Sequence, residues 1–210
     1  MTDLQCTARV FVARHGESDY ESELLSDHGG SLTDLGREQS RSLGQSLARE
    51  RIARVWSSPM ARAVQTAELV AAELGCGVTV REGRREFGVG VHAGLPPEPD
   101  PFGATFDRWL DGDLGARIEG AESGAEVVGR VADVLLEVAD LHRGEAVLVV
   151  SHGGAICTAV PVLARNLHPR FPQGRALPNT GVVQLEADDV TGWRAVSWAG
   201  EDVSDTTPGV

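Results

Sequence analysis

Two histidines of this 210-residue chain stand in matching local sequences, and together they suggest one site for phosphate chemistry. His15 follows Arg14 and comes directly after the apolar run 10–13, while His152 comes just after the apolar run 147–150. Short apolar runs are typical of buried strands, and ligands of open α/β sheets gather beyond the carboxyl ends of strands. Two imidazoles and an arginine at one sheet edge therefore predict a phosphate-transfer site that can work without metal.

The segment 56–67 supplies a further cation, Arg62. We expect Ser58 to cap a helix with Pro59 in its first turn, which places Arg62 near the positive end of the helix dipole. Apolar residues then recur at helical spacing as far as Gly75, a predicted C-terminal cap. A bound anion would be stabilised at the start of this helix.

Four motifs in fixed order carry a resemblance to a known family. They are Arg14-His15-Gly16-Glu17, the segment 32–39, the segment 57–62 and Ser151-His152-Gly153-Gly154. With them the chain resembles the histidine phosphatase superfamily, which includes cofactor-dependent phosphoglycerate mutases and many phosphatases. The likeness runs from about residue 8 to about residue 185, which is most of the chain.

The resemblance implies a role for each matching residue. His15 matches the nucleophile that becomes a phosphohistidine, and His152 matches the second histidine, which donates to a phosphoryl oxygen. Arg14 and Arg62 match the arginines that hold the phosphoryl oxygens, a task suited to the planar guanidinium group. Further contacts to phosphate or substrate are expected from Gly16, Ser18, Gly153 and Asn179.

A proton donor for the leaving oxygen is expected at Glu86. The family places its general acid in a glutamate followed at four and eight positions by glycine, and Gly90 and Gly94 fit that spacing. Neighbours that raise the pKa of this carboxyl would let it protonate the leaving group and then activate water. Glu82 is a competing carboxylate, but it lacks the glycine spacing.

Two departures from the family pattern disfavour a mutase. Where many members carry a phosphate-binding asparagine this chain has Glu21, which we expect to point away from the phosphate or to sit in a rebuilt loop. The loop 19–31 instead resembles the acidic lead-in of the small phosphohistidine-phosphatase branch. All 19 basic residues are arginine, so the lysines with which mutases hold phosphoglycerate are missing, and lysine-based Schiff-base chemistry is excluded.

The pattern of elements predicts a single α/β domain over residues 1–210. The expected fold is a three-layer α/β/α sandwich with a mainly parallel central sheet, of the phosphoglycerate mutase type. We expect a long helix over 33–50, a later helix opened by a capping box at Ser123, and a tail over 200–210 that is frayed. A small cap insertion is expected at about 95–120, with an amphipathic helix marked by Phe102, Phe106, Trp109 and Leu110. The expected strands are 8–13, 54–56, 78–81, 147–150, 182–185 and 194–198.

The composition of the chain limits the classes of molecule that the protein could bind. A formal net charge of −12 argues against nucleic acid and anionic membranes, and no apolar stretch is long enough to span a bilayer. The three cysteines are odd in number and widely spaced, which argues against a disulfide framework and a metal cluster. We expect a cytoplasmic protein without a metal or other cofactor, and the oligomeric state stays open.

The function predicted from sequence is metal-independent hydrolysis of phosphomonoesters, with an enzyme of the histidine acid phosphatase type. The expected partner is a small phosphorylated metabolite, although a phosphohistidine protein also fits. A cofactor-dependent phosphoglycerate mutase is the first alternative. A non-catalytic binder of phosphorylated ligands is the second, and it would not need the acid at Glu86.

Overall fold

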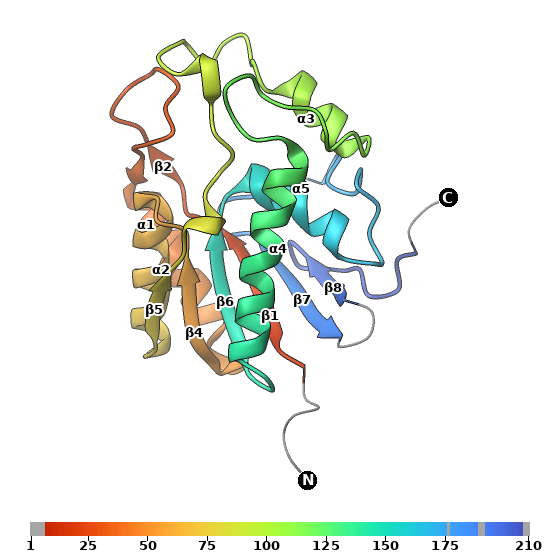
Figure 1. The fold of residues 1–210 in the computed structure, drawn as a ribbon. Helices are drawn as coiled ribbons and strands as arrows, with labels where there is room; N and C mark the ends of the chain where they lie inside the picture. The colour runs from red at the N-terminus through yellow and green to blue at the C-terminus, as the bar shows by residue number, and fades with distance from the viewer. Residues whose placement is uncertain (1–6, 176, 189–191, 208–210) are drawn as a thin grey trace.

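A computed structural model describes residues 7–175, 177–188 and 192–207. Within these ranges, one sheet of seven strands has the order β5-β4-β6-β1-β7-β8-β9 (Figure 1). A small two-stranded sheet pairs β2 (Ser18–Asp19) with β3 (Ser31–Leu32). Strands β5, β4, β6 and β1 pair in parallel, and β7, β8 and β9 continue the sheet with antiparallel pairs. The main-sheet strands are β1 (Arg9–Arg14), β4 (Ile52–Ser57), β5 (Gly77–Val80), β6 (Ala146–Ser151), β7 (Val182–Asp188), β8 (Gly192–Trp198) and β9 (Glu201–Asp202).

Helices cover both faces of the sheet, as the predicted three-layer sandwich requires (Figure 1). Helices α1 (Asp34–Ser46) and α2 (Ala61–Leu74) pack on one face, where Phe11, Val55 and Leu148 belong to the same apolar cluster as their inner residues. Helices α4 (Gly124–Leu141) and α5 (Gly153–Leu163) pack on the opposite face, against alternate residues of the same strands. Because successive side chains of a strand point to opposite faces, each apolar strand contributes to both clusters.

The helix ends follow the expected chemistry in most places. The Thr33 side chain accepts from the backbone of Gly36, and Ser123 and Glu126 form the predicted capping box of α4. Gly75 ends α2 with a left-handed backbone, φ 67°. The predicted helix 33–50 is divided, since α1 ends at Ser46 and a short 3₁₀ turn, η2 (Ala48–Glu50), follows.

The start of α2 differs from the expectation. Met60, not Ser58, is the N-cap residue, and the helix begins at Ala61. Ser58 instead accepts a hydrogen bond from the backbone N–H of Met60, at 3.2 Å. Its hydroxyl also lies 2.8 Å from Nε2 of His152. Arg62 is thus the second helical residue, and the expected position near the positive end of the helix dipole is retained.

The insertion at 95–120 contains the expected short helix, α3 (Gly103–Leu110), which lies above α4 and α5 in Figure 1. Trp109 is 1% exposed and donates its indole N–H to the carbonyl of Ala116. It packs edge-on against Phe87, which lies between two short 3₁₀ turns, η3 (Glu82–Arg84) and η4 (Gly90–His92). The aromatic residues therefore hold the insertion to the body of the domain.

The expectation of a frayed tail over 200–210 is wrong for its described part. Strand β9 pairs with β8, and Val203 is 4% exposed. The hydroxyl of Thr206 donates to the backbone of Asn166, and the Asn166 amide donates to the carbonyl of Val203. Edge-strand pairing and one buried valine thus order a segment that is acidic by composition; residues 208–210 lie outside the described residues.

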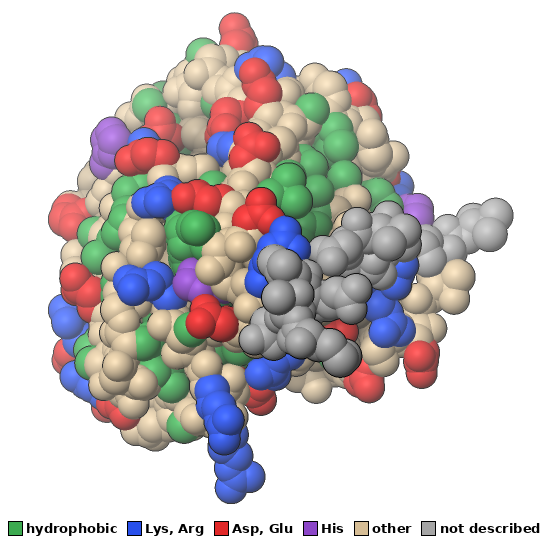
Figure 2. Space-filling model, turned by 60° about the horizontal axis from the view of Figure 1, so that its bottom comes forward, with side chains coloured by type: hydrophobic (Ala, Val, Ile, Leu, Met, Phe, Trp, Pro, Cys, Tyr) green, Lys and Arg blue, Asp and Glu red, His purple; other side chains and the backbone are tan. Residues whose placement is uncertain are grey.

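The surface carries charges of both signs. Figure 2 shows acidic and arginine side chains interspersed over one face, with apolar side chains between them. The net charge of −12 is therefore not gathered in a single acidic patch on that face. No helix in the described ranges is long and apolar enough to cross a membrane.

Candidate active site

Three neighbouring parallel strands end at one place, and this register assembles the site. Arg14 of β1 lies beside Ser151 of β6, and Ser57 of β4 lies beside Val150 of the same strand. The residues that follow each strand end therefore meet at the carboxyl edge of the sheet. The rings of His15 and His152 lie there with centroids 5.1 Å apart.

His15 is held as a neutral imidazole, and both of its ring nitrogens have hydrogen-bond partners. Its Nδ1 lies 2.7 Å from the carbonyl of Gly16, which can only accept a hydrogen, so the ring hydrogen is on Nδ1. Its Nε2 accepts from Nε of Arg62 at 3.2 Å. Burial, together with the nearby guanidinium groups of Arg62 and Arg14, lowers the pKa of His15 to about 4. The ring is therefore unprotonated at neutral pH, as a nucleophile requires.

Two arginines flank this histidine. Arg62 is 4% exposed, donates to the carbonyl of Gly29 and lies against the ring of Tyr20, 5.4 Å from its centroid. Arg14 donates from Nη1 to the carbonyl of Leu177, and its buried Nε has no hydrogen-bond partner among the described residues. Both guanidinium groups have donor capacity for an oxyanion.

His152 is fully buried, and its two ring nitrogens have different surroundings. Its Nε2 lies 2.8 Å from the hydroxyl of Ser58. That hydroxyl accepts from the backbone of Met60, and its own hydrogen can be donated to Nε2. Nδ1 has no partner among the described residues, so in the tautomer with the hydrogen on Nδ1 the ring can donate to a ligand oxygen. Burial and the positive charge of Arg62 lower the pKa of His152 well below its ordinary value.

Glu86 lies at the N-terminus of α5, beside the two histidines. Its two oxygens accept from the backbone N–H groups of Gly154 at 2.9 Å and Ala155 at 2.7 Å, and one also accepts from Phe87 at 3.1 Å. These bonds favour the ionised carboxylate, but the loss of water around the partly buried side chain disfavours it more, so the pKa of Glu86 is raised above its usual value. A carboxyl with a raised pKa is a better proton donor to a leaving group than an ordinary carboxylate, and its ionised form can take the proton back.

Gly154 is required for this arrangement. A Cβ at Gly154 would lie 2.3 Å from Cε1 of Phe87 and 2.8 Å from Oε1 of Glu86. At Gly153 a Cβ would come no closer than 3.4 Å to Arg14. The second glycine of the Ser-His-Gly-Gly motif therefore makes room for the carboxyl.

The secondary positions predicted from sequence divide into two groups. Ser18, in β2 (Ser18–Asp19), and Gly153 and Asn179 line the same cavity as His15. Asn179 also donates to the carbonyl of His15, at 3.2 Å. Gly16 does not line it: its N–H donates to Thr66, and a Cβ there would lie 2.5 Å from the carbonyl of Gly36. The structure thus gives Gly16 a packing role between β1 and α1.

Glu21 points away from the phosphate-binding groups, as expected. Its Oε2 accepts from the backbone N–H of Gly30 at 3.0 Å and closes the loop that leads to β3 (Ser31–Leu32). This bond lowers the pKa of the exposed carboxyl. Glu82, the competing acid, is exposed and pairs with Arg85 at 3.4 Å.

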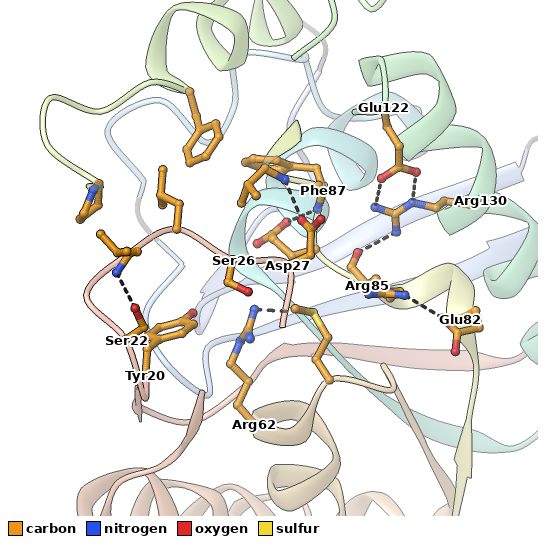
Figure 3. A pocket seen from close by; sticks show the side chains of 18 of the residues that line it. Tyr20, Ser22, Ser26, Asp27, Arg62, Glu82, Arg85, Phe87, Glu122 and Arg130 are labelled. Atoms are coloured by element: carbon orange, nitrogen blue, oxygen red, sulfur yellow. Dashed lines mark hydrogen bonds and ion pairs between the residues drawn. The ribbon is translucent and has the colours of Figure 1, made fainter. Parts of the chain in front are cut away.

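Two cavities meet at the site. The first, of about 460 Å³, contains Arg14, His15, Arg62 and Glu86. The second, of about 830 Å³, begins at Tyr20, Arg62 and Glu86, which line both cavities, and extends under the insertion (Figure 3). A phosphate held beside His15 would therefore have its ester group facing the larger cavity.

Sequence reasoning misses some residues of the site. It assigns Ser58 to a helix cap, although Ser58 contacts His152, and it does not single out Tyr20, which lies over Arg62. Ser58 belongs to the same motif as Arg62, and this is the sequence signal that could have indicated a place for Ser58 in the site. Cys157 is partly buried and lines the His15 cavity, and its burial raises the pKa of the thiol to about 12. Cys6 lies outside the described residues.

No group of three or more His, Cys, Asp or Glu residues that could hold a metal ion occurs in residues 7–175, 177–188 and 192–207. The guanidinium groups of Arg14 and Arg62 line the His15 cavity, and guanidinium groups bind an oxyanion directly.

Comparisons with known proteins agree with the geometry. The chain is 30% identical to phosphoglycerate mutase-like protein 4 of Arabidopsis thaliana, over 94% of this chain and 86% of that protein. It is 28% identical to the probable phosphoglycerate mutase GpmB of Salmonella choleraesuis, over 95% of this chain and 94% of that protein.

A mycobacterial glucosyl-3-phosphoglycerate phosphatase, solved with inorganic phosphate, has a similar structure. The TM-score is 0.75 at 25% identity, covering 92% of this chain and 97% of that chain. The family model of the histidine phosphatase superfamily, branch 1, matches residues 10–200. The chain therefore belongs to the histidine phosphatase superfamily.

Proposed function

We propose that this protein hydrolyses phosphomonoesters through a phosphohistidine on His15, as an enzyme of the histidine acid phosphatase type that needs no metal. The observation that carries the proposal is the placement of Glu86. This partly buried carboxyl, with its raised pKa, lines both the cavity of His15 and the larger cavity where a leaving group would sit. A protein that only binds phosphate has no need of such an acid.

In the first step, Nε2 of His15 attacks phosphorus in line with the ester oxygen. The new N–P bond forms as the P–O bond breaks, and Glu86 transfers its proton to the departing alkoxide. Arg14 and Arg62 hold the phosphoryl oxygens, and Nδ1–H of His152 donates to one of them as charge develops.

In the second step, water replaces the alcohol. Glu86, now ionised, takes a proton from this water as its oxygen attacks phosphorus, and the N–P bond breaks. Inorganic phosphate leaves, His15 returns to its neutral form, and Glu86 is protonated again. The three backbone N–H groups on Glu86 stabilise the ionised form that exists between the two steps.

The alternative is a phosphoglycerate mutase, which the names of the curated relatives favour. A mutase must keep water from the phosphohistidine and return the phosphoryl group to a second hydroxyl. Glu21 does not face the phosphate site, and the chain has no lysine for a phosphoglycerate carboxylate. Those two features favour hydrolysis.

The deciding experiment measures phosphate release from p-nitrophenyl phosphate in the presence of EDTA, beside a 3-phosphoglycerate mutase assay on the same preparation. Release without isomerisation is expected. A rapid acid-free quench with ³²P-labelled substrate should trap label on wild-type protein and none on His15→Ala. Isomerisation without release would make the protein a mutase, and absence of both with retained phosphate binding would make it a binder.

A further inference from the structure

The larger cavity is the part of the molecule that differs in chemistry from the phosphate site. At about 830 Å³ it lies in the upper range for small-molecule pockets, and it is entered past Tyr20, Arg62 and Glu86. On the proposed function, this cavity receives the alcohol of the phosphomonoester, because Glu86 must reach the ester oxygen. Its lining should therefore determine the substrate class.

Most of the lining is hydrocarbon. Phe87 is fixed edge-on between Phe102 and Trp109, with ring centroids 5.7 Å and 5.4 Å away. Figure 3 shows Tyr20 and Phe87 on opposite sides of Arg62, which points into the cavity from α2. The apolar and aromatic residues of the lining are Tyr20, Leu24, Leu25, Met60, Phe87, Val89, Pro97 and Phe102.

The arginines of this lining, other than Arg62, are engaged with carboxylates. Arg130 donates to both oxygens of Glu122, at 2.6 and 3.0 Å, and to the carbonyls of Gly83 and Arg85 (Figure 3). Arg85 pairs more loosely with Glu82, at 3.4 Å, on the exposed rim. A carboxylate on a ligand would have to compete with these partners.

Acidic groups outnumber these arginines along the same lining. Glu23, Asp27, Glu82 and Glu122 accompany Arg85 and Arg130, when the catalytic Arg62 and Glu86 are set aside. Asp27 accepts from the backbone N–H of Val89 at 2.7 Å and ties the loop 19–31 to the opposite wall. A negatively charged leaving group would therefore enter an acidic, largely apolar cavity, where Arg85 and Arg130 already pair with carboxylates of the protein.

We propose that the substrate is a phosphomonoester of a bulky, uncharged, largely apolar alcohol, and that the larger cavity discriminates against alcohols that carry a carboxylate. The three-carbon acid of phosphoglycerate would fill little of an 830 Å³ cavity, and the arginines of its lining other than Arg62 already pair with carboxylates of the protein. An aromatic or branched hydrocarbon alcohol would contact Phe87, Phe102 and Met60 while its ester oxygen meets Glu86. The proposal rests on the proposed function for the position of the ester.

The test compares two substrates that differ in one group, 4-methylbenzyl phosphate and 4-carboxybenzyl phosphate. Glycerol 3-phosphate serves as the reference, because its alcohol is small and uncharged. We expect kcat/KM to be about 30-fold higher for the methyl compound than for the carboxylate, since a charge removed from water without a partner is strongly disfavoured. Equal values, or a preference for the carboxylate, would overturn the proposal. If the carboxylate is preferred, kcat/KM of Arg85→Gln for the same compound shows whether Arg85 binds that carboxylate.

Phe102→Ala tests the apolar wall itself. It should lower the ratio of kcat/KM between 4-methylbenzyl phosphate and glycerol 3-phosphate about tenfold, because it removes one aromatic side chain from the contact. Phe102→Leu should restore most of the ratio by restoring apolar volume. Phe171→Ala, which changes a phenylalanine packed on Trp198 outside the cavity, should leave the ratio as in wild type. An unaltered ratio in Phe102→Ala would contradict the assignment.

Failure of hydrolysis is distinguishable from failure of this inference. Calorimetric titration of His15→Ala with the same two benzyl phosphates measures their relative affinities without turnover. Tighter binding of the methyl compound would support the apolar cavity even if no monoester is hydrolysed. Tighter binding of the carboxylate would reject it whatever the reaction.

Discussion

Nε of Arg62 donates to Nε2 of His15 at 3.2 Å, so the proposed nucleophilic nitrogen and a proposed phosphate-holding cation are in direct contact. The contact keeps Nε2 unprotonated, and the positive charge of Arg62 helps to lower the pKa of His15. A phosphoryl group that enters would replace this contact with bonds from Arg62 to its oxygens. In the proposed mechanism, the same arginine thus prepares the nucleophile before binding and holds the phosphate after it.

His15→Ala should abolish turnover. Because the phosphoryl group has no other acceptor in the proposed mechanism, kcat is expected to fall at least about a thousandfold. Hydrolysis of p-nitrophenyl phosphate gives kcat, and circular dichroism checks the fold. The exposed His168 provides a control, since His168→Ala should behave as wild type; activity retained in His15→Ala would refute the nucleophile assignment.

Glu86→Gln should reveal the general acid through its dependence on the leaving group. For a benzyl phosphate, whose alkoxide needs a proton, kcat/KM is expected to fall about 100-fold or more. For p-nitrophenyl phosphate the loss in kcat/KM should be much smaller, and phosphoenzyme should accumulate because water is no longer activated. In Glu82→Gln, kcat/KM should depend on the leaving group as in wild type. If Glu82→Gln shows the selective loss with benzyl phosphate and Glu86→Gln does not, Glu82 is the acid.

Ser58→Ala should change the tautomer of His152. Without the serine hydroxyl, Nε2 of His152 has no hydrogen to accept, and a ring hydrogen on Nε2 would leave Nδ1 unable to donate to phosphate. We expect kcat/KM to fall about tenfold, the loss of one donor hydrogen bond in the transition state. Nitrogen-15 histidine spectra should show the Nδ1–H form of His152 in wild type and a different form in the variant. Ser57→Ala, next to it, should keep the wild-type spectrum.

Gly154→Ala should disable the protein more than Gly153→Ala. The added methyl group at Gly154 would overlap Phe87 and press on Glu86, whereas at Gly153 it would meet Arg14 at 3.4 Å. We expect a loss in kcat/KM of about 100-fold for the first, as for loss of the acid, and a loss below about tenfold for the second. Equal losses would show that Glu86 is not positioned by Gly154.

Acid should destabilise the fold through His15. The pKa of His15 is about 4 in the folded state against an ordinary value of 6.5, so between these values the unfolded state binds more protons and the free energy of unfolding falls as pH falls. The full effect is about 3 kcal/mol at pH values below 4. Urea unfolding at pH 7.5 and 4.5 should therefore show a smaller loss in His15→Gln than in wild type. The pKa of Glu86 is raised instead, so through this carboxyl the free energy of unfolding falls as pH rises from its ordinary pKa toward its raised pKa.

Sequence reasoning is strongest where side-chain periodicity or a motif directly reports structure. The buried run 147–150 predicts strand β6, and the matching run before Arg14 predicts its neighbour β1. Those two elements alone imply that His15 and His152 lie together. The capping box at Ser123 is equally direct, because both of its hydrogen bonds are local.

Predictions fail where a tertiary contact overrides a local signal. Ser58 precedes a proline and looks like a helix cap, but it contacts His152, which is 94 residues away in sequence. The acidic tail pairs with β8 and buries Val203, and nothing in its composition reports that neighbour. The walls of the larger cavity are missed for the same reason, since Leu25 and Phe102 line it together only after folding.

The common ending of β1, β4 and β6 has a consequence for folding kinetics. Ser58 and His152 are 94 residues apart, and Arg62 and His15 are 47 apart, so no single segment of the chain contains the site. Contacts of such high sequence separation form late and slowly, after loop closure across much of the chain. Recovery of activity during refolding therefore reports completion of the central parallel strands. Partly folded chains should be inactive.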